Sequence, residues 1–139
     1  MASASPAGGV TRVGIIGCGN ISNIYLKNTA QLPGLKLIAC ADLVMERAEA
    51  KAQEHGIRAM TVEDLIASPD IDMIVNLTIP AAHAPVNLAA LHSGKHVYTE
   101  KPLATTRADG QRTVELAVEK GLRVGSAPDT FLGAGLQTC

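Results

Sequence analysis

Short apolar runs alternate with longer segments of mixed polarity along most of the chain, starting at Arg12. The apolar runs have the length of strands and lack alternating polar residues, which is typical of strands buried on both faces of a parallel sheet. The segments between them carry apolar residues at helical spacing and end at glycine or proline. The pattern predicts an α/β fold in which one domain forms a doubly wound parallel sheet.

The expected strands cover residues 12–16, 35–41, 58–61, 72–77, 96–99 and 123–126. The expected helices cover residues 20–31, 44–55, 62–67, 85–91 and 106–120. In the first helix, Ile21, Ile24 and Tyr25 form an apolar stripe at helical spacing. Pro85 is expected in the first turn of the fourth helix, where a missing N–H costs nothing. Residues 1–10 are expected to form a disordered tail, and 11–128 the domain.

Composition excludes several classes of protein. The chain is 47% apolar and 18% charged, so it can bury a core. A net charge of -1 gives no electrostatic case for nucleic acid, and no apolar run approaches the roughly 18 residues of a membrane span. The start carries neither a basic region nor an apolar stretch, so it is no secretory signal. Three cysteines without metal-ligand spacing predict a soluble, cytoplasmic protein with no metal site.

A glycine loop follows the first expected strand and opens the first expected helix. Gly17 permits a tight turn, and Gly19 lets the backbone approach a pyrophosphate at the positive end of a helix. Ser22 stands where the GxGxxG pattern has its third glycine, and it is small enough for close helix packing. Glycine turns are common, but the strand–loop–helix context favours dinucleotide binding over a purely structural turn.

Asp42 ends the second expected strand. A carboxylate there can accept hydrogen bonds from the adenosine ribose hydroxyls and repels a 2′-phosphate, which favours NAD over NADP, although NADP stays open. Asp42 is also a good N-cap for the helix that begins near Val44, and both roles are compatible.

Two further loops follow the fourth and fifth expected strands, at the edge where doubly wound sheets bind ligands. Thr78 and Pro80 are candidates to line the nicotinamide side, as is His83, for which a polar position at a helix start is an equal alternative. Lys101, between Glu100 and Pro102, could exchange a proton beside a charged cofactor. The alternative is that Lys101 is only an exposed lysine in a loop. The position of the segment directly after the fifth strand favours the functional interpretation.

The segments VGIIGCGNIS, ACAD, NLTIPAAH and GKHVYTEKPLA, in this order, resemble the N-terminal half of the Gfo/Idh/MocA oxidoreductases. The resemblance implies a Rossmann fold and an NAD(P)-dependent dehydrogenase that moves a hydride between nicotinamide and a sugar or polyol carbon. It implies that Lys101 is the catalytic lysine and that Glu100 supports it near the cofactor. It also implies that the dinucleotide site is lined by Gly17, Gly19, Asn20, Ile21 and Asp42.

Members of that family continue into a second α/β domain that binds substrate and forms oligomers. This chain stops at Cys139, so residues 129–139 are expected to start the connection to that domain, which is absent here. We expect the chain alone to be inactive. Two alternatives stay open: a non-catalytic module that senses NAD or binds a partner protein, and a methyltransferase dependent on S-adenosylmethionine. The Glu100–Pro102 segment argues against the methyltransferase.

Overall fold

Strands and helices alternate along residues 9–127, which are the residues described by the computed structural model. The strands are β1 (Thr11–Ile16), β2 (Leu35–Ala41), β3 (Arg58–Met60), β4 (Met73–Asn76), β5 (His96–Thr99) and β6 (Val124–Ser126). The helices are α1 (Ser22–Thr29), α2 (Met45–His55), α3 (Val62–Ala67), α4 (Pro80–His92) and α5 (Arg107–Glu119). The connection expected at 129–139, and most of the tail expected at 1–10, lie outside the described residues.

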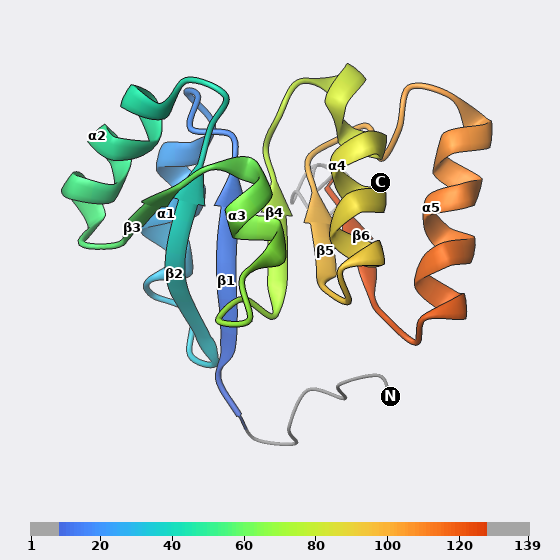
Figure 1. Cartoon of the computed structure of the whole chain (residues 1–139), viewed down its shortest axis with the longest axis horizontal. Coiled ribbons are helices and arrows are strands. Elements are labelled where there is room, and N and C mark those ends of the chain that lie inside the picture. Colours follow the sequence, from blue (N-terminus) through green and yellow to red (C-terminus); the bar gives the residue numbers. More distant parts are fainter. Residues whose placement is uncertain (1–8, 128–139) are drawn as a thin grey trace, which may run out of the picture.

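The strands form one parallel sheet in the order β3-β2-β1-β4-β5-β6 (Figure 1). This is the order of a Rossmann domain, in which two halves wind outward from the first and fourth strands. The doubly wound parallel sheet expected from the sequence is therefore confirmed. Because all strands run the same way, the loops that leave their carboxyl ends gather at one edge of the sheet.

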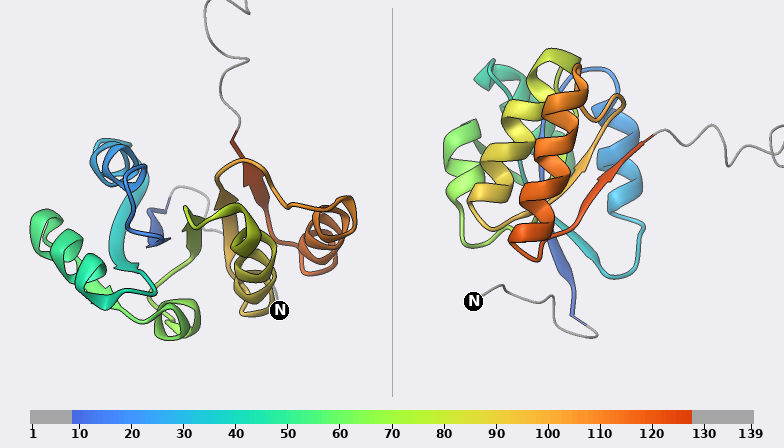
Figure 2. Two further views of the ribbon diagram at one scale, coloured as in Figure 1. Left: turned by 90° about the horizontal axis from the view of Figure 1, so that it is seen from above. Right: turned by 90° about the vertical axis from the view of Figure 1, so that its right-hand side faces the viewer.

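Each face of the sheet has its own core. Side chains from α1 and α2 pack in one cluster, and side chains from α3, α4 and α5 pack in the other. Figure 2 shows α1 across the sheet from α4 and α5, which lie side by side. No helix among residues 9–127 has the length and apolar character needed to cross a membrane.

Two expectations about helices are wrong. Ile21 and Ile24 of the expected stripe are exposed, and α1 instead buries Ser22, Leu26 and Thr29. The small polar residues face the sheet because α1 lies close to it. The fourth helix begins at Pro80 rather than near Pro85, which lies inside α4. Either proline could occupy a first turn, and the earlier one does.

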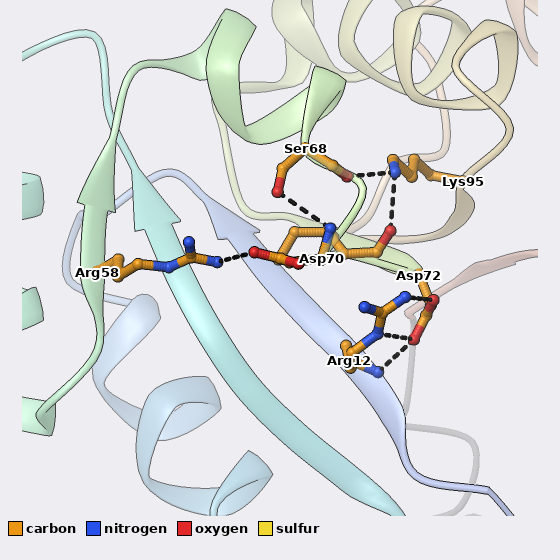
Figure 3. A network of polar contacts seen from close by, with 7 residues as sticks. Arg12, Arg58, Ser68, Asp70, Asp72 and Lys95 are labelled. Atoms are coloured by element: carbon orange, nitrogen blue, oxygen red, sulfur yellow. Dashed lines mark hydrogen bonds and ion pairs between the residues drawn. The ribbon is translucent and has the colours of Figure 1, made fainter.

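A polar network joins the amino-terminal ends of the central strands (Figure 3). The Arg12 guanidinium contacts both carboxylate oxygens of Asp72, from Nε to Oδ2 at 2.9 Å and from Nη2 to Oδ1 at 2.7 Å. The Arg12 backbone N–H also donates to Asp72, which ties the start of β1 to the start of β4. Hydrogen bonding to Arg12 lowers the pKa of the Asp72 carboxyl below its ordinary value.

Lys95 completes this network from the turn before β5. Its Nζ donates to the backbone carbonyls of Ser68 at 2.6 Å and Ile71 at 2.8 Å, and only 8% of the residue is exposed. Burial lowers the pKa of the Lys95 ammonium group. The network therefore holds the edge of the sheet where the central strands begin, opposite the loops at their carboxyl ends.

We expect Asp72→Asn to lower the free energy of unfolding by about 1 kcal/mol at pH 7, because the pair is only partly shielded from water. The folded pKa of Asp72 is lowered, so its stabilisation is present above an ordinary value of about 3.9 and is lost as the pH falls through the folded value. Urea unfolding from pH 7 down to about pH 3 should show the difference shrinking.

Asp70→Asn is the matched control, because the Asp70–Arg58 pair is more than half exposed on both sides. It should cost less than Asp72→Asn at pH 7, and its loss should change less as the pH falls. Equal losses for the two variants would contradict the importance given to the Arg12–Asp72 pair.

Candidate functional site

Gly17 turns the chain out of β1 in a conformation that favours glycine. Its φ is +102°, and a Cβ built on it would lie 2.6 Å from the backbone oxygen of Leu77. Its N–H donates to the Ala41 carbonyl at 2.8 Å. Gly17 therefore lies between the ends of β2 and β4, where no side chain fits, as the glycine pattern predicts.

Gly19 differs from Gly17, because a Cβ added to it would meet nothing within 4 Å. The fold therefore does not need this glycine, and the open space in front of it is available to a ligand. Asn20 and Ile21 follow it and are exposed. Ser22 is fully buried, and its hydroxyl donates to the Gly19 carbonyl at 2.6 Å, which fixes the loop to the first turn of α1.

Asp42 is bound directly to the glycine loop. Its Oδ2 accepts from the Cys18 N–H at 2.8 Å, and its Oδ1 accepts from the Val44 N–H at 2.9 Å. The N-cap of α2 is Val44, so the alternative that made Asp42 the cap is wrong, although Asp42 orders the turn that leads into α2. A carboxylate has about four acceptor positions, so further hydrogen bonds to ribose hydroxyls are possible.

The thiol of Cys18 faces away from the open side of the loop. Its Sγ lies 3.5 Å from the Ala41 carbonyl oxygen, and the residue is 5% exposed. The pKa of the Cys18 thiol is raised, first by its interaction with the Cys40 thiol and to a smaller extent by burial. The loop therefore presents backbone groups, and no reactive thiolate, to a ligand.

The loop after β4 is ordered by Asn76, which is fully buried at the end of that strand. Asn76 Oδ1 accepts from the Thr78 hydroxyl at 2.7 Å and from its N–H at 3.2 Å. Asn76 Nδ2 donates to Asn87 Oδ1 at 2.8 Å and to the His83 carbonyl at 3.1 Å. Thr78 is half-buried, and Pro80, the first residue of α4, is exposed at the rim.

His83 lies in the first turn of α4 with no exposed surface. Its Nδ1 is 2.6 Å from the Pro102 carbonyl oxygen, and its Nε2 is 2.9 Å from the Thr78 carbonyl oxygen. Carbonyl oxygens only accept, so the ring must donate to at least one of them, and its tautomer decides which. His83 is thus neither a solvated residue nor one with a ring nitrogen facing open space.

The segment Glu100–Pro102 follows β5 and contains a cis peptide bond between Lys101 and Pro102. Glu100 Oε1 accepts from the Tyr25 hydroxyl of α1 at 2.6 Å, and Glu100 Oε2 accepts from the Lys101 N–H at 3.0 Å. The Glu100 N–H donates to the Asn76 carbonyl. The backbone around Lys101 is held on both sides, while Lys101 itself is exposed.

The predicted residues all lie in loops or first helical turns at the carboxyl ends of β2, β1, β4 and β5, which are neighbours in the sheet. His83 is the one whose side chain is enclosed. The sequence reasoning missed Tyr25, Asn76 and Asn87, which hold these loops. An amide at the end of an apolar strand was the available signal for Asn76, whereas Tyr25 passed as part of an apolar stripe.

The residues fit a dinucleotide. Gly19 leaves open space at the start of a helix whose free N–H groups attract anions, and Asp42 keeps acceptor capacity one strand away. Among residues 9–127, no group of three or more His, Cys, Asp or Glu side chains could hold a metal ion.

A family model described as an oxidoreductase family with an NAD-binding Rossmann fold matches residues 11–127. Inositol 2-dehydrogenase of Salmonella typhimurium is 36% identical over 117 residues, which cover 81% of this chain and 35% of that protein. The chain thus spans about a third of the curated relatives that it matches. These similarities do not favour the methyltransferase alternative.

Two solved structures share the fold at 30% sequence identity. One is the WlbA dehydrogenase of Bordetella pertussis in complex with NADH and UDP-GlcNAcA, with a TM-score of 0.88 over 93% of this chain and 41% of that chain. The other is biliverdin reductase of Synechocystis in complex with biliverdin and NADP+, with a TM-score of 0.85 over 91% and 40%. The same fold therefore occurs with both nicotinamide cofactors.

Proposed function

The chain belongs to the Gfo/Idh/MocA oxidoreductase family, as its NAD-binding Rossmann domain, and we propose that the complete protein transfers a hydride between NAD and a sugar or polyol. The observation that carries this proposal is the junction of two sites at one sheet edge. The Tyr25–Glu100 hydrogen bond joins the helix after the glycine loop to the segment that holds Lys101. A module that only binds nucleotide has no need of that second site.

When bound, the nicotinamide ring accepts or donates the hydride. Backbone groups at Gly19, Asn20 and Ile21 would hold the pyrophosphate, and Asp42 would accept hydrogen bonds from the adenosine ribose. Thr78 and Pro80 line the rim toward the nicotinamide. His83, being enclosed, contributes by filling the space between the Thr78 and Pro102 carbonyls and donating to at least one of them.

Lys101 is the group that handles the proton. Its exposed Nζ takes a proton from the substrate hydroxyl during oxidation and returns one to the carbonyl oxygen during reduction. Glu100 fixes the Lys101 backbone, and Pro102 is held by His83, so the side chain starts from an ordered position.

The substrate class follows two similar proteins, inositol 2-dehydrogenase and the WlbA dehydrogenase, whose structure holds UDP-GlcNAcA. Biliverdin, bound by another relative of similar fold, is chemically different. Substrate selection is therefore assigned to residues beyond this chain, together with the contacts that form oligomers. Free, buried Cys18 and Cys40 suit a reducing compartment, and we place the protein in the cytoplasm.

The 139-residue chain should bind NAD, with heat released in calorimetric titration at cofactor concentrations up to about 1 mM. Gly19→Ala should keep the free energy of unfolding within about 0.5 kcal/mol, because its Cβ meets only open space. It should weaken NAD binding by about tenfold or more, because that space receives the pyrophosphate. A folded wild-type chain that releases no heat would refute cofactor binding.

Asp42→Asn should weaken NAD binding by about tenfold, since hydrogen bonds to a charged acceptor are lost. NADP binding should strengthen, because the negative charge that repels its 2′-phosphate is removed. Asp72→Asn makes the same chemical change at the opposite edge of the sheet and serves as the control. If both variants altered the ratio of the two dissociation constants equally, Asp42 would not select the cofactor.

Lys101→Ala in the complete protein should lower kcat by about 10²–10⁴-fold while NAD still binds. Reduction of NAD with inositol, or with a panel of free and nucleotide-linked sugars, is the measurement. Lys36→Ala removes an exposed lysine at the other edge of the sheet and should change nothing. Full turnover by the Lys101 variant would show that Lys101 does not transfer the proton, whereas NAD binding without any turnover by the complete wild-type protein would favour a sensing module. Turnover by the 139-residue chain alone would show that no second domain is needed.

A further inference from the structure

The Tyr25 hydroxyl makes a hydrogen bond that spans 75 positions of sequence. Tyr25 lies on the first turn of α1 after the glycine loop, and its hydroxyl donates to Glu100 Oε1 at 2.6 Å. A hydroxyl that donates to a carboxylate at this distance forms a charge-assisted bond, stronger than one between neutral groups. The bond therefore fixes the Glu100 carboxylate relative to α1.

The other oxygen of that carboxylate is also used. Glu100 Oε2 accepts from the Lys101 N–H at 3.0 Å, so one carboxylate links the Tyr25 hydroxyl to the Lys101 backbone. A flexible glutamate side chain in a half-buried position would otherwise sample several rotamers. Only a held carboxylate can hold the Lys101 amide in turn.

Tyr25 is suited to remain a donor. The pKa of the Tyr25 phenol is raised above its ordinary value, mainly by burial and further by the hydrogen bond to Glu100. Its ring also packs at a tilt against that of Tyr98 in β5, with 6.4 Å between the centroids. The strand that leads into Glu100 thus contacts Tyr25 through its ring as well.

We propose that Tyr25 is a positioning residue for Lys101, acting through Glu100 from the helix that follows the glycine loop. This inference rests on the proposed function, in which Lys101 transfers the proton. Tyr25 makes the position of Lys101 depend on the helix against which the cofactor lies. Tyr25 orders the backbone at the N–H of Lys101. The next residue, Pro102, is contacted separately by His83.

Nuclear magnetic resonance of the 139-residue chain tests the inference with Tyr25→Phe, which keeps the ring and removes the hydroxyl. Amide hydrogen exchange at Lys101 should accelerate about threefold, and its amide proton should shift upfield, because its acceptor is no longer held. The side-chain amide of Asn87, which donates to the Leu103 carbonyl, should keep its resonances. Unchanged exchange at Lys101 in a folded variant would overturn the proposal.

Thr113→Val is the matched control. It also removes a hydroxyl that donates within the fold, from Thr113 Oγ1 to the Asp109 carbonyl, but it lies on α5. It should leave exchange at Lys101 unchanged. Equal acceleration in both variants would mean that general loss of stability, and not the Tyr25–Glu100 bond, loosens the segment.

A second measurement reads the hydrogen bond from the tyrosine itself, and it holds even where Tyr25→Phe fails to fold. The chain has two tyrosines and no tryptophan, so Tyr98→Phe leaves Tyr25 as the only ionising phenol. Its tyrosinate absorbance should appear above pH 10, and adding Glu100→Gln should lower that pKa. A titration that is independent of residue 100 would overturn the proposal.

The same samples separate this inference from the proposed function. If the wild-type chain binds no NAD but Lys101 still responds to Tyr25→Phe, the proposed function fails and the positioning link stands as geometry. If NAD binds and Lys101 does not respond, the inference alone fails.

Discussion

The loop after β1 and the loop after β4 come into contact where Gly17 passes the Leu77 carbonyl. The two strands are neighbours in the sheet, and their loops lead to helices on opposite faces. A Cβ on Gly17 would lie 2.6 Å from the Leu77 carbonyl oxygen, so the approach needs a glycine. In doubly wound sheets the divergence of such loops opens the crevice that receives a ligand. The positions of Gly19 on one side and Thr78 on the other both depend on this contact.

Buried polar groups then hold the loops in place. Asn76, Asn87 and Thr99 have no exposed surface, and each has a hydrogen-bond partner. Leaving such a group without a partner costs about 1–3 kcal/mol, so these bonds favour one arrangement of the loops over its alternatives. The aliphatic cores on the two faces stabilise the fold, and the side-chain amides of Asn76 and Asn87 fix the conformations of the loops.

The two edges of the sheet carry different chemistry for this reason. At the amino-terminal edge, Arg12 and Asp72 bind each other, and the buried Lys95 donates to two backbone carbonyls. At the carboxyl edge, Asp42 keeps spare acceptor positions and Lys101 is exposed. Two structures of similar fold hold chemically different molecules together with a nicotinamide cofactor, biliverdin in one and UDP-GlcNAcA in the other.

The strands of a doubly wound sheet, the glycine loop and the acid after β2 could be predicted because they depend on local pattern, whereas the order of the strands came only from the structure. Apolar runs, turn residues and the place of Gly17, Gly19 and Asp42 after strands are readable from neighbours in the chain. The apolar stripe of α1 was mispredicted, because Ile21 and Ile24 are exposed while the polar Thr29 is buried. The burial of Ser22 agrees with the close helix packing expected of it.

Contacts between distant segments could not be read in this way. The bond from Tyr25 to Glu100 joins residues 75 positions apart, and the His83 ring lies between carbonyls of two separate loops. Periodicity reports which side of an element is apolar, but it carries no information on which polar atoms meet across a sheet edge. The sequence by itself determined which loops follow β1, β2, β4 and β5 and which polar residues they carry, and the packing of α1 and α4 onto the sheet determined which distant atoms hold the backbone at Lys101.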